Sequence, residues 1–221
     1  MNQTKIIELI KSANHDNQAE KYDENIARDV LNNDYIREKY FELHDRIIQL
    51  ANINENISLL DIGIGTGLLE EKINGLCRIY GIDISENMLL KLNEKKLMVE
   101  TKKGSINNIP FESGKFDVIV SCFTFHHLTD DEKLNSLYEM NRVLKMGGVI
   151  LLGDFMYENE NSLNELKIRF VNENRTDMLE ELEVENFTNI EILNKWFNEI
   201  GFKLYYERVS TISWITLAGK H

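Results

Sequence analysis

Hydrophobic residues change their spacing near residue 57, and this change divides the chain into two parts. Before it, apolar side chains recur at helical spacing in two stripes, at residues 6–10 and 40–50. The segment between them, residues 14–33, is polar and is predicted to be a loop or a mobile helix. We therefore expect residues 1–56 to form an N-terminal helical cap or lid, and residues 57–221 to form the core.

Beyond residue 57, short apolar runs alternate with helical patterns. The run FDVIVSCF is apolar and β-branched almost throughout, which is typical of a central parallel strand covered on both faces. A helix is predicted at residues 68–76. The strands predicted in this region lie at residues 58–62, 78–84, 99–103, 116–123 and 149–152.

Residues that can cap a helix predict where further helices begin and end. Ser85 precedes an apolar stripe, and the capping boxes TDDE and TNIE begin at Thr129 and Thr188. Gly147–Gly148 is predicted to end the helix that Thr129 opens, and Gly201 the helix that Thr188 opens.

Strands that alternate with helices predict an α/β fold with a doubly wound, seven-stranded, mostly parallel sheet. The last two strands, predicted at residues 202–209 and 212–217, are joined by a short turn and suggest an antiparallel hairpin at the sheet edge. The acidic segment at residues 157–187 is moderately helical, and we expect it to be a second cap piece inserted into the core. In such folds a ligand binds beyond the carboxyl ends of the strands.

Charge and cysteine content indicate which partners and which cellular compartment to expect for this protein. The chain carries 25 Lys and Arg against 37 Asp and Glu, and its net charge of −12 comes with no basic run. Such a surface repels phosphate backbones, so no nucleic-acid partner is expected. Two cysteines make no disulfide framework, and we find neither a signal peptide nor an apolar stretch that spans a bilayer. We expect a cytoplasmic monomer or homodimer without membrane contact.

The sequence LLDIGIGTG at residues 59–67 places three glycines between a strand and a helix. Glycines let a ligand approach the backbone, and a helix N-terminus offers unpaired N–H groups. Nicotinamide sites use G-x-G-x-x-G, whereas this spacing is G-x-G-x-G and Leu68 stands where the third glycine is wanted. Asp61 beside the turn would repel a pyrophosphate. It favours a cofactor with an ammonium group and a sulfonium.

A second acid lies at the predicted end of the next strand. Asp83 follows Gly67 by sixteen residues, a separation that suits a carboxylate accepting hydrogen bonds from both hydroxyls of a ribose. Ile84 is the next residue and Met88 follows four residues later, and both offer apolar faces to an adenine.

These residues, with three further segments, resemble the class I S-adenosylmethionine-dependent methyltransferases. The segments are GIDIS at residues 81–85, GSINNIPFESGKFDVIVSCFTFHHL at 104–128 and RVLKMGGVILLGDF at 142–155. AEKYD at residues 19–23 is similar to the A-x-x-Y-D segment of the helical cap in small-molecule members. The resemblance covers nearly the whole chain and implies a Rossmann-like methyltransferase fold. The C-terminal segment is similar to that of a bacterial branch of this family, whose members mostly lack an assigned substrate.

The resemblance also implies a role for each matching residue. Asp61 would lie near the ammonium of S-adenosylmethionine, and Asp83 would hold its ribose. Ser105 stands where the family usually has an acid against the adenine, so a hydroxyl or backbone contact would replace a carboxylate. The remaining contacts implied are Gly63, Gly65 and Ser121 to the methionine part, Ile84, Met88 and Ile106 to the adenine, and Tyr22 covering the cofactor.

Two adjacent histidines follow the fourth predicted strand. His126 is the candidate general base, although both His126 and His127 also fit a role in shaping the loop before Thr129. No further cysteine or carboxylate falls at ligand spacing from Cys122 and these histidines, so no metal site is expected.

We therefore expect a methyltransferase that moves a methyl group from S-adenosylmethionine to a small-molecule acceptor by direct in-line displacement. The sulfonium is already activated, so the expected reaction is metal-independent and relies on orientation. Three alternatives stay open: a nicotinamide oxidoreductase, a methyltransferase acting on tRNA or protein, and a non-catalytic S-adenosylmethionine-binding protein. The acidic segment either is solvated or selects a cationic substrate.

Overall fold

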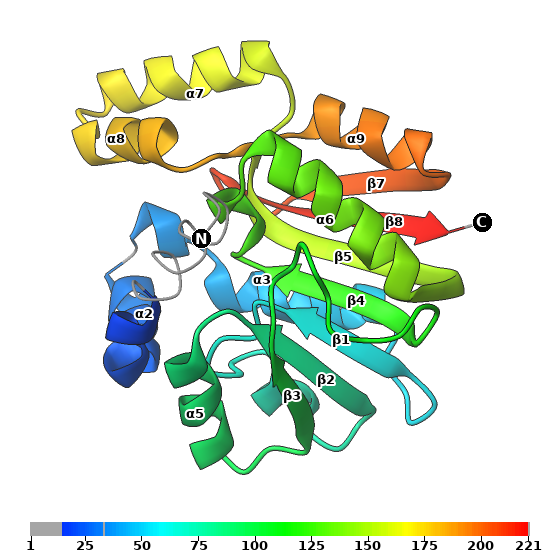
Figure 1. The fold of residues 1–221 in the computed structure, drawn as a ribbon. Helices are drawn as coiled ribbons and strands as arrows, with labels where there is room; N and C mark the ends of the chain where they lie inside the picture. The colour runs from blue at the N-terminus through cyan, green and yellow to red at the C-terminus, as the bar shows by residue number, and fades with distance from the viewer. Residues whose placement is uncertain (1–14, 33, 221) are drawn as a thin grey trace, which may run out of the picture.

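A single path of seven strands forms the centre of the described chain (Figure 1). The computed structural model describes residues 15–32 and 34–220, so the apolar stripe at residues 6–10 lies outside it. The strands run in the order β3-β2-β1-β4-β5-β8-β7. Neighbours from β3 to β5 are parallel, and β8 is antiparallel to both β5 and β7. The predicted doubly wound sheet and its antiparallel edge hairpin are confirmed.

Most strands begin and end close to where the apolar runs predict. Their bounds are β1 Ser58–Ile62, β2 Arg78–Asp83, β3 Val99–Lys103, β4 Phe116–Cys122, β5 Leu144–Tyr157, β7 Phe202–Arg208 and β8 Ser213–Lys220. A two-residue strand, β6 (Thr188–Asn189), lies off this path and pairs with the end of β5.

Helices cover both faces of the sheet. Side chains of β4 alternate between two apolar clusters, with Ile119 facing one and Val120 the other. The first cluster is closed by α6 and α9, and the second by α2, α3, α4, α7 and α8. The helices are α2 Tyr22–Leu31, α3 Tyr40–Ala51, α4 Glu70–Ile73, α5 Glu86–Glu94, α6 Asp130–Val143, α7 Glu160–Asn172, α8 Thr176–Val184 and α9 Ile190–Glu199, with 3-10 turns η1 Ala19–Lys21, η2 Tyr35–Arg37 and η3 Phe125–His127.

Three local predictions are wrong. Helix α4 is one turn rather than nine residues. Gly147 and Gly148 do not end α6, because the chain already turns extended at Leu144 (φ −79°, ψ 137°) and pairs with β4. Both glycines lie inside β5, where Gly147 takes a φ of +74° at an irregular stretch of the pairing. Asn189, not Thr188, caps α9, because its side chain accepts hydrogen bonds from two N–H groups of the first turn.

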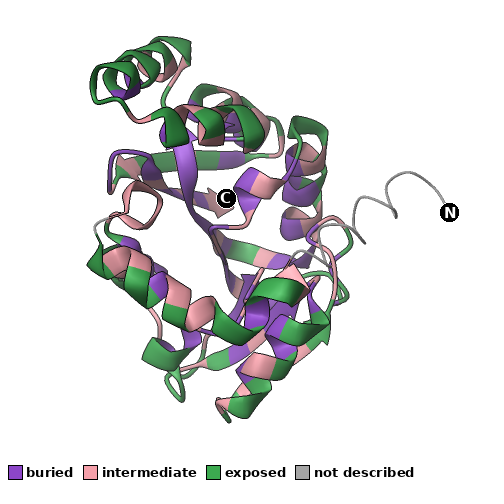
Figure 2. Cartoon of the chain, turned by 90° about the vertical axis from the view of Figure 1, so that its left-hand side faces the viewer, coloured by how far each residue is buried: buried purple, intermediate pink, exposed green. Residues whose placement is uncertain are grey.

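The helices expected to form the cap lie where the strands end. Figure 1 shows α2, together with α7 and α8, beside the carboxyl ends of the parallel strands. In Figure 2, which faces that side, the inner strands are largely buried and the helices carry exposed outer faces. The division into cap and core stays a prediction. No helix among the described residues is long and apolar enough to cross a membrane.

The capping box at the start of α6 generates a stability prediction. The Thr129 hydroxyl accepts the N–H of Glu132, and the Glu132 carboxylate accepts the N–H of Thr129. Thr129→Ala removes the hydrogen bond from the Glu132 N–H to the Thr129 hydroxyl. It should lower the free energy of unfolding by about 1 kcal/mol in urea titrations. Thr176→Ala is the control, because Thr176 begins α8 with its side chain exposed and capping nothing. Equal losses in both variants would contradict the assignment.

Candidate active site

A cavity of about 650 Å³ opens beyond the carboxyl ends of β1, β2, β4 and β5. Its walls combine the strand ends with residues from the N-terminal segment and from the end of α8. Most of the site residues predicted from the sequence line it: Tyr22, Gly63, Gly65, Asp83, Ile84, Met88, Ser105, Ile106 and His126. Asp61 and Ser121 lie outside this lining.

The glycine turn after β1 has a backbone that side chains would disturb. Gly63, Gly65 and Gly67 have φ values of +78°, +56° and +82°. A Cβ at Gly63 would lie 2.1 Å from the Thr124 hydroxyl oxygen, so the space beside this glycine is already filled from the loop after β4. The turn therefore presents bare backbone to the cavity, as the sequence predicts.

Asp83 holds this turn in place from the end of β2. One carboxylate oxygen accepts the N–H of Gly65 at 2.9 Å, and the other accepts the N–H of Ser85 at 2.8 Å. Burial raises the pKa of Asp83 despite these two hydrogen bonds. Each carboxylate oxygen can accept a second hydrogen bond, so Asp83 can order the turn and still bind two hydroxyls of a ligand.

Ile84, Met88 and Ile106 line the same side of the cavity and supply its apolar surface. Ser105 lies beside them, and its hydroxyl accepts the N–H of Asn107 at 3.3 Å in a local turn. This side of the cavity suits a flat apolar ring, and Asp83 lies at the edge of this apolar surface.

Asp61 lies in a smaller cavity of about 30 Å³ that adjoins the first at Tyr22, Gly63, Gly65 and Cys122. One Asp61 oxygen and both Glu70 oxygens have no hydrogen-bond partner of good geometry among the described residues. Burial raises the pKa of Asp61 to about 7, and burial with the neighbouring Asp61 raises the pKa of Glu70 well above its usual value. The pair therefore retains a proton near neutral pH.

Ser121 has a structural contact instead of a place in the cavity. It is fully buried in β4, and its hydroxyl donates to the carbonyl oxygen of Ile62 at 2.8 Å, which ties β4 to the end of β1. Cys122 follows it and lines both cavities, because alternate residues of a strand point to opposite faces.

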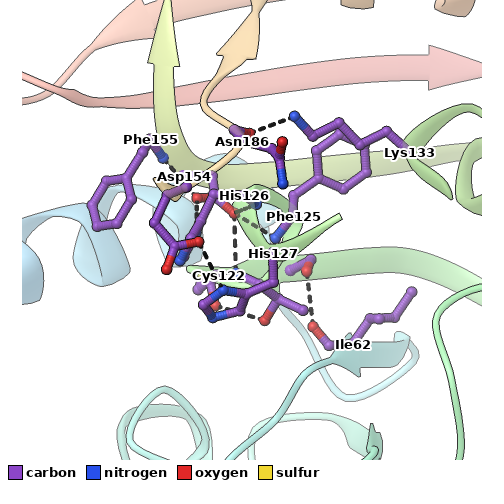
Figure 3. A network of polar contacts seen from close by, with 12 residues as sticks. Ile62, Cys122, Phe125, His126, His127, Lys133, Asp154, Phe155 and Asn186 are labelled. Atoms are coloured by element: carbon purple, nitrogen blue, oxygen red, sulfur yellow. Dashed lines mark hydrogen bonds and ion pairs between the residues drawn. The ribbon is translucent and has the colours of Figure 1, made fainter. Parts of the chain in front are cut away.

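His126 is held by a fully buried acid. Its Nδ1 lies 2.5 Å from Oδ1 of Asp154, which lies within the buried stretch of β5 (Figure 3). The other Asp154 oxygen accepts the N–H groups of Thr124, Phe125 and His126 at 3.0, 2.6 and 3.3 Å. Burial alone would raise the pKa of Asp154, but His126 keeps it below its usual value. The ionised acid fixes the proton on Nδ1, so the Nε2 of His126 carries the lone pair.

The chain is similar to known proteins along most of its length. A model of the methyltransferase domain matches residues 60–152. An uncharacterized methyltransferase from Staphylococcus carnosus is 30% identical over 189 residues, which cover 85% of this chain and 90% of the relative. The chain belongs to the class I methyltransferase family. The predicted resemblance is confirmed, and with it S-adenosylmethionine as the family's methyl donor.

Two solved structures share the fold. A SAM-dependent methyltransferase from Aquifex aeolicus has a TM-score of 0.61 at 21% identity, over 83% of this chain and 93% of the other. The DhpI–SAM–HEP complex has a TM-score of 0.70 at 16% identity, over 95% and 97%.

Several residues of this methyltransferase site were missed from the sequence. Asp154 follows the apolar sequence VILLG inside β5, and an acid directly after such a run is the signal that could have found it. Arg37 and His15 come from segments without a pattern, and Glu185 from the acidic stretch; all three line the cavity. Phe155, the next residue of β5, lines it too.

The two contacts of Asp83 predict how a substitution acts. Asp83→Ala removes the acceptor for Gly65 and the expected acceptor for the ribose. It should weaken adenosylhomocysteine binding by roughly 1.5–3 kcal/mol, the range for hydrogen bonds to a charged group, as measured by calorimetry. Unchanged affinity with a native circular dichroism spectrum would show that the ribose is held elsewhere.

The buried pair of Asp61 and Glu70 predicts a pH dependence of stability. A carboxyl group whose pKa is raised by folding binds its proton more tightly in the folded chain, so folding loses stability as pH rises above the unfolded pKa. Glu70→Gln removes this dependence at Glu70. The free energy of unfolding of the variant, minus that of the natural chain, should therefore increase between pH 5 and pH 8. Urea titrations at each pH measure it. Glu55→Gln, an exposed control, should show no such trend.

Proposed function

We propose that this methyltransferase acts on a small-molecule acceptor, with His126 as the base that takes the acceptor's proton. The observation that carries the proposal is the buried Asp154–His126 pair, whose Nε2 has no hydrogen-bond partner among the described residues although His126 lines the cavity. The methyl group of S-adenosylmethionine is already activated and needs only orientation. The remaining chemical step is removal of the acceptor's proton.

The cavity residues fit S-adenosylmethionine along its length. Asp83 suits the ribose hydroxyls, and the bare backbone at Gly63 and Gly65 suits close approach of the methionine part. Arg37 lines the cavity, and its guanidinium lies 5.5 Å from the ring centre of Tyr40. This guanidinium has no hydrogen bond or ion pair with the described residues. Its free donors suit the carboxylate of the methionine part.

Asp61 is the acceptor expected beside the ammonium of the methionine part. Its buried, unpartnered oxygen lies in the small cavity that adjoins the glycine turn. A cation there would relieve the cost of an ionised buried acid. When bound, S-adenosylmethionine supplies a methyl group on an activated sulfonium.

The proton step follows from the fixed imidazole. The acceptor's lone pair forms the new bond to the methyl carbon, the carbon–sulfur bond breaks with its electrons left on sulfur, and the acceptor's proton passes to Nε2 of His126. Asp154 stabilises the imidazolium that forms. A base in this place suits an acceptor that arrives neutral, with a hydroxyl, thiol or amine N–H.

The size and cover of the cavity support a small acceptor. A volume of about 650 Å³ falls in the range of cavities that enclose a cofactor or a drug-sized ligand. Residues 181 and 184–186 line it at the end of α8, and residues 15, 18 and 22 line it at the N-terminal segment. Most acids of the segment at residues 157–187 are instead exposed, and Glu185 pairs with His127, which argues against selection of a cationic acceptor.

An isotope-transfer screen tests the small-molecule assignment. Purified protein is incubated with donor carrying a labelled methyl group and, in parallel, with a metabolite extract, bulk tRNA and a protein extract. Label should enter a low-molecular-mass product, which mass spectrometry then identifies. Label in tRNA or protein would support the macromolecular alternative, and no transfer to any fraction would support a non-catalytic binder.

The base assignment predicts a specific kinetic defect. His126→Gln should lower the turnover number roughly 100-fold or more, the scale of general base catalysis, while adenosylhomocysteine affinity stays within twofold of the natural chain. Rates are measured on the acceptor found in the screen. A variant with nearly full turnover would leave His126 as a residue that only shapes its loop.

A further inference from the structure

Three potential metal ligands lie close together on the side of the cavity where His126 lies. His126, His127 and Glu185 each place one ligand atom within 4.8 Å of the others, and all three line the cavity. They come from η3 and from the residue after α8, which lie far apart in the sequence. The histidine rings lie with their centres 4.0 Å apart.

The separations are close to those around a single ion. Nδ1 of His127 lies 3.2 Å from a carboxylate oxygen of Glu185. Two ligands of a tetrahedral ion, each bonded at about 2.0–2.1 Å, lie about 3.3–3.4 Å apart. An ion between His127 and Glu185 would therefore need little movement of either side chain.

The chemical state of the ligands also suits a cation. Asp154 accepts the Nδ1–H of His126 and leaves Nε2 as a donor atom, the carboxylate–histidine arrangement that commonly lies behind a metal-binding imidazole. His15 packs edge-on against His127, with ring centres 5.1 Å apart, and closes the cluster on the side of the N-terminal segment.

We propose that Nε2 of His126, a ring nitrogen of His127 and the carboxylate of Glu185 bind one divalent transition-metal ion, with Zn²⁺ the best match. Two imidazoles and one carboxylate are a donor set that Zn²⁺ accepts. Three protein ligands leave one coordination position for water or another ligand. The site is thus an exchangeable one and not a structural centre that the fold requires.

The ion and the acceptor's proton would compete for the same lone pair of His126. The ion-bound enzyme cannot use Nε2 as a base, so the site is inhibitory: Zn²⁺ should suppress methyl transfer and leave adenosylhomocysteine binding intact. This consequence rests on the proposed function, whereas binding of the ion does not.

Metal binding is tested without cofactor or acceptor. Tag-free protein is stripped with a chelator and titrated with Zn²⁺ alone in a calorimeter, and Co²⁺ is added separately to record its visible absorption. We expect one ion per chain and intense bands of a four-coordinate Co²⁺ site. His127→Ala and Glu185→Gln should each weaken Zn²⁺ binding at least tenfold, and Glu185→Gln serves if the first variant folds poorly.

Glu183→Gln is the matched control, because it removes the same charge from an exposed position two residues away on α8. It should bind Zn²⁺ as the natural chain does. Unaltered affinity in both site variants, an equal loss in the control, or no one-to-one binding would each overturn the proposal. Because these titrations contain neither donor nor acceptor, their failure would leave the proposed methyl transfer untouched.

Discussion

One buried carboxylate holds together the loop that carries His126 on one side of the cavity. Asp154 has no exposed surface, and it accepts hydrogen bonds from three consecutive N–H groups after β4 and from the ring of His126. A buried acid left without these donors would destabilise the fold, so the loop has little freedom to depart from this conformation. The loop in turn places Thr124 against the glycine turn, where only a residue without a side chain fits at position 63.

The end of α8 is attached to the same loop. The N–H of Asn186 donates to the carbonyl of His126 at 3.0 Å, and the carbonyl of Asn186 accepts a 2.5 Å hydrogen bond from Nζ of Lys133 (Figure 3). Lys133 is fully buried, and burial lowers its pKa. The cavity residues at the end of α8 are therefore hydrogen-bonded to the residue proposed as the base, so a movement of α8 would displace His126.

On the opposite side of the cavity, acids of the N-terminal segment bind this segment to the rest of the chain. Asp16 accepts a hydrogen bond from Ser85 at 2.5 Å, and Asp23 accepts one from Thr66 at 2.5 Å and pairs with Lys95 at 2.6 Å. These contacts join the segment to the start of α5 and to the glycine turn. Asp16 did not stand out in the sequence, because an isolated acid in a polar stretch carries no period and no motif. Asp23 belongs to the AEKYD segment, but its contacts with Thr66 and Lys95 were not predicted. Ser85 was recognised as a helix cap, but its second partner came from 69 residues away.

The sequence by itself determined the sheet, the glycine turn and the acid at the end of β2. Each of these depends on local chemistry: β-branched runs, residues that tolerate positive φ, and a polar side chain placed directly after a strand. Tertiary structure decided the rest. Pairing with β4 drew Gly147 and Gly148 into β5, a hydrogen bond across the sheet turned Ser121 away from the cavity, and packing buried Asp61 against Glu70. It also brought Asp154 and Glu185 to the two histidines, since partners that come from distant segments are joined only when the chain folds.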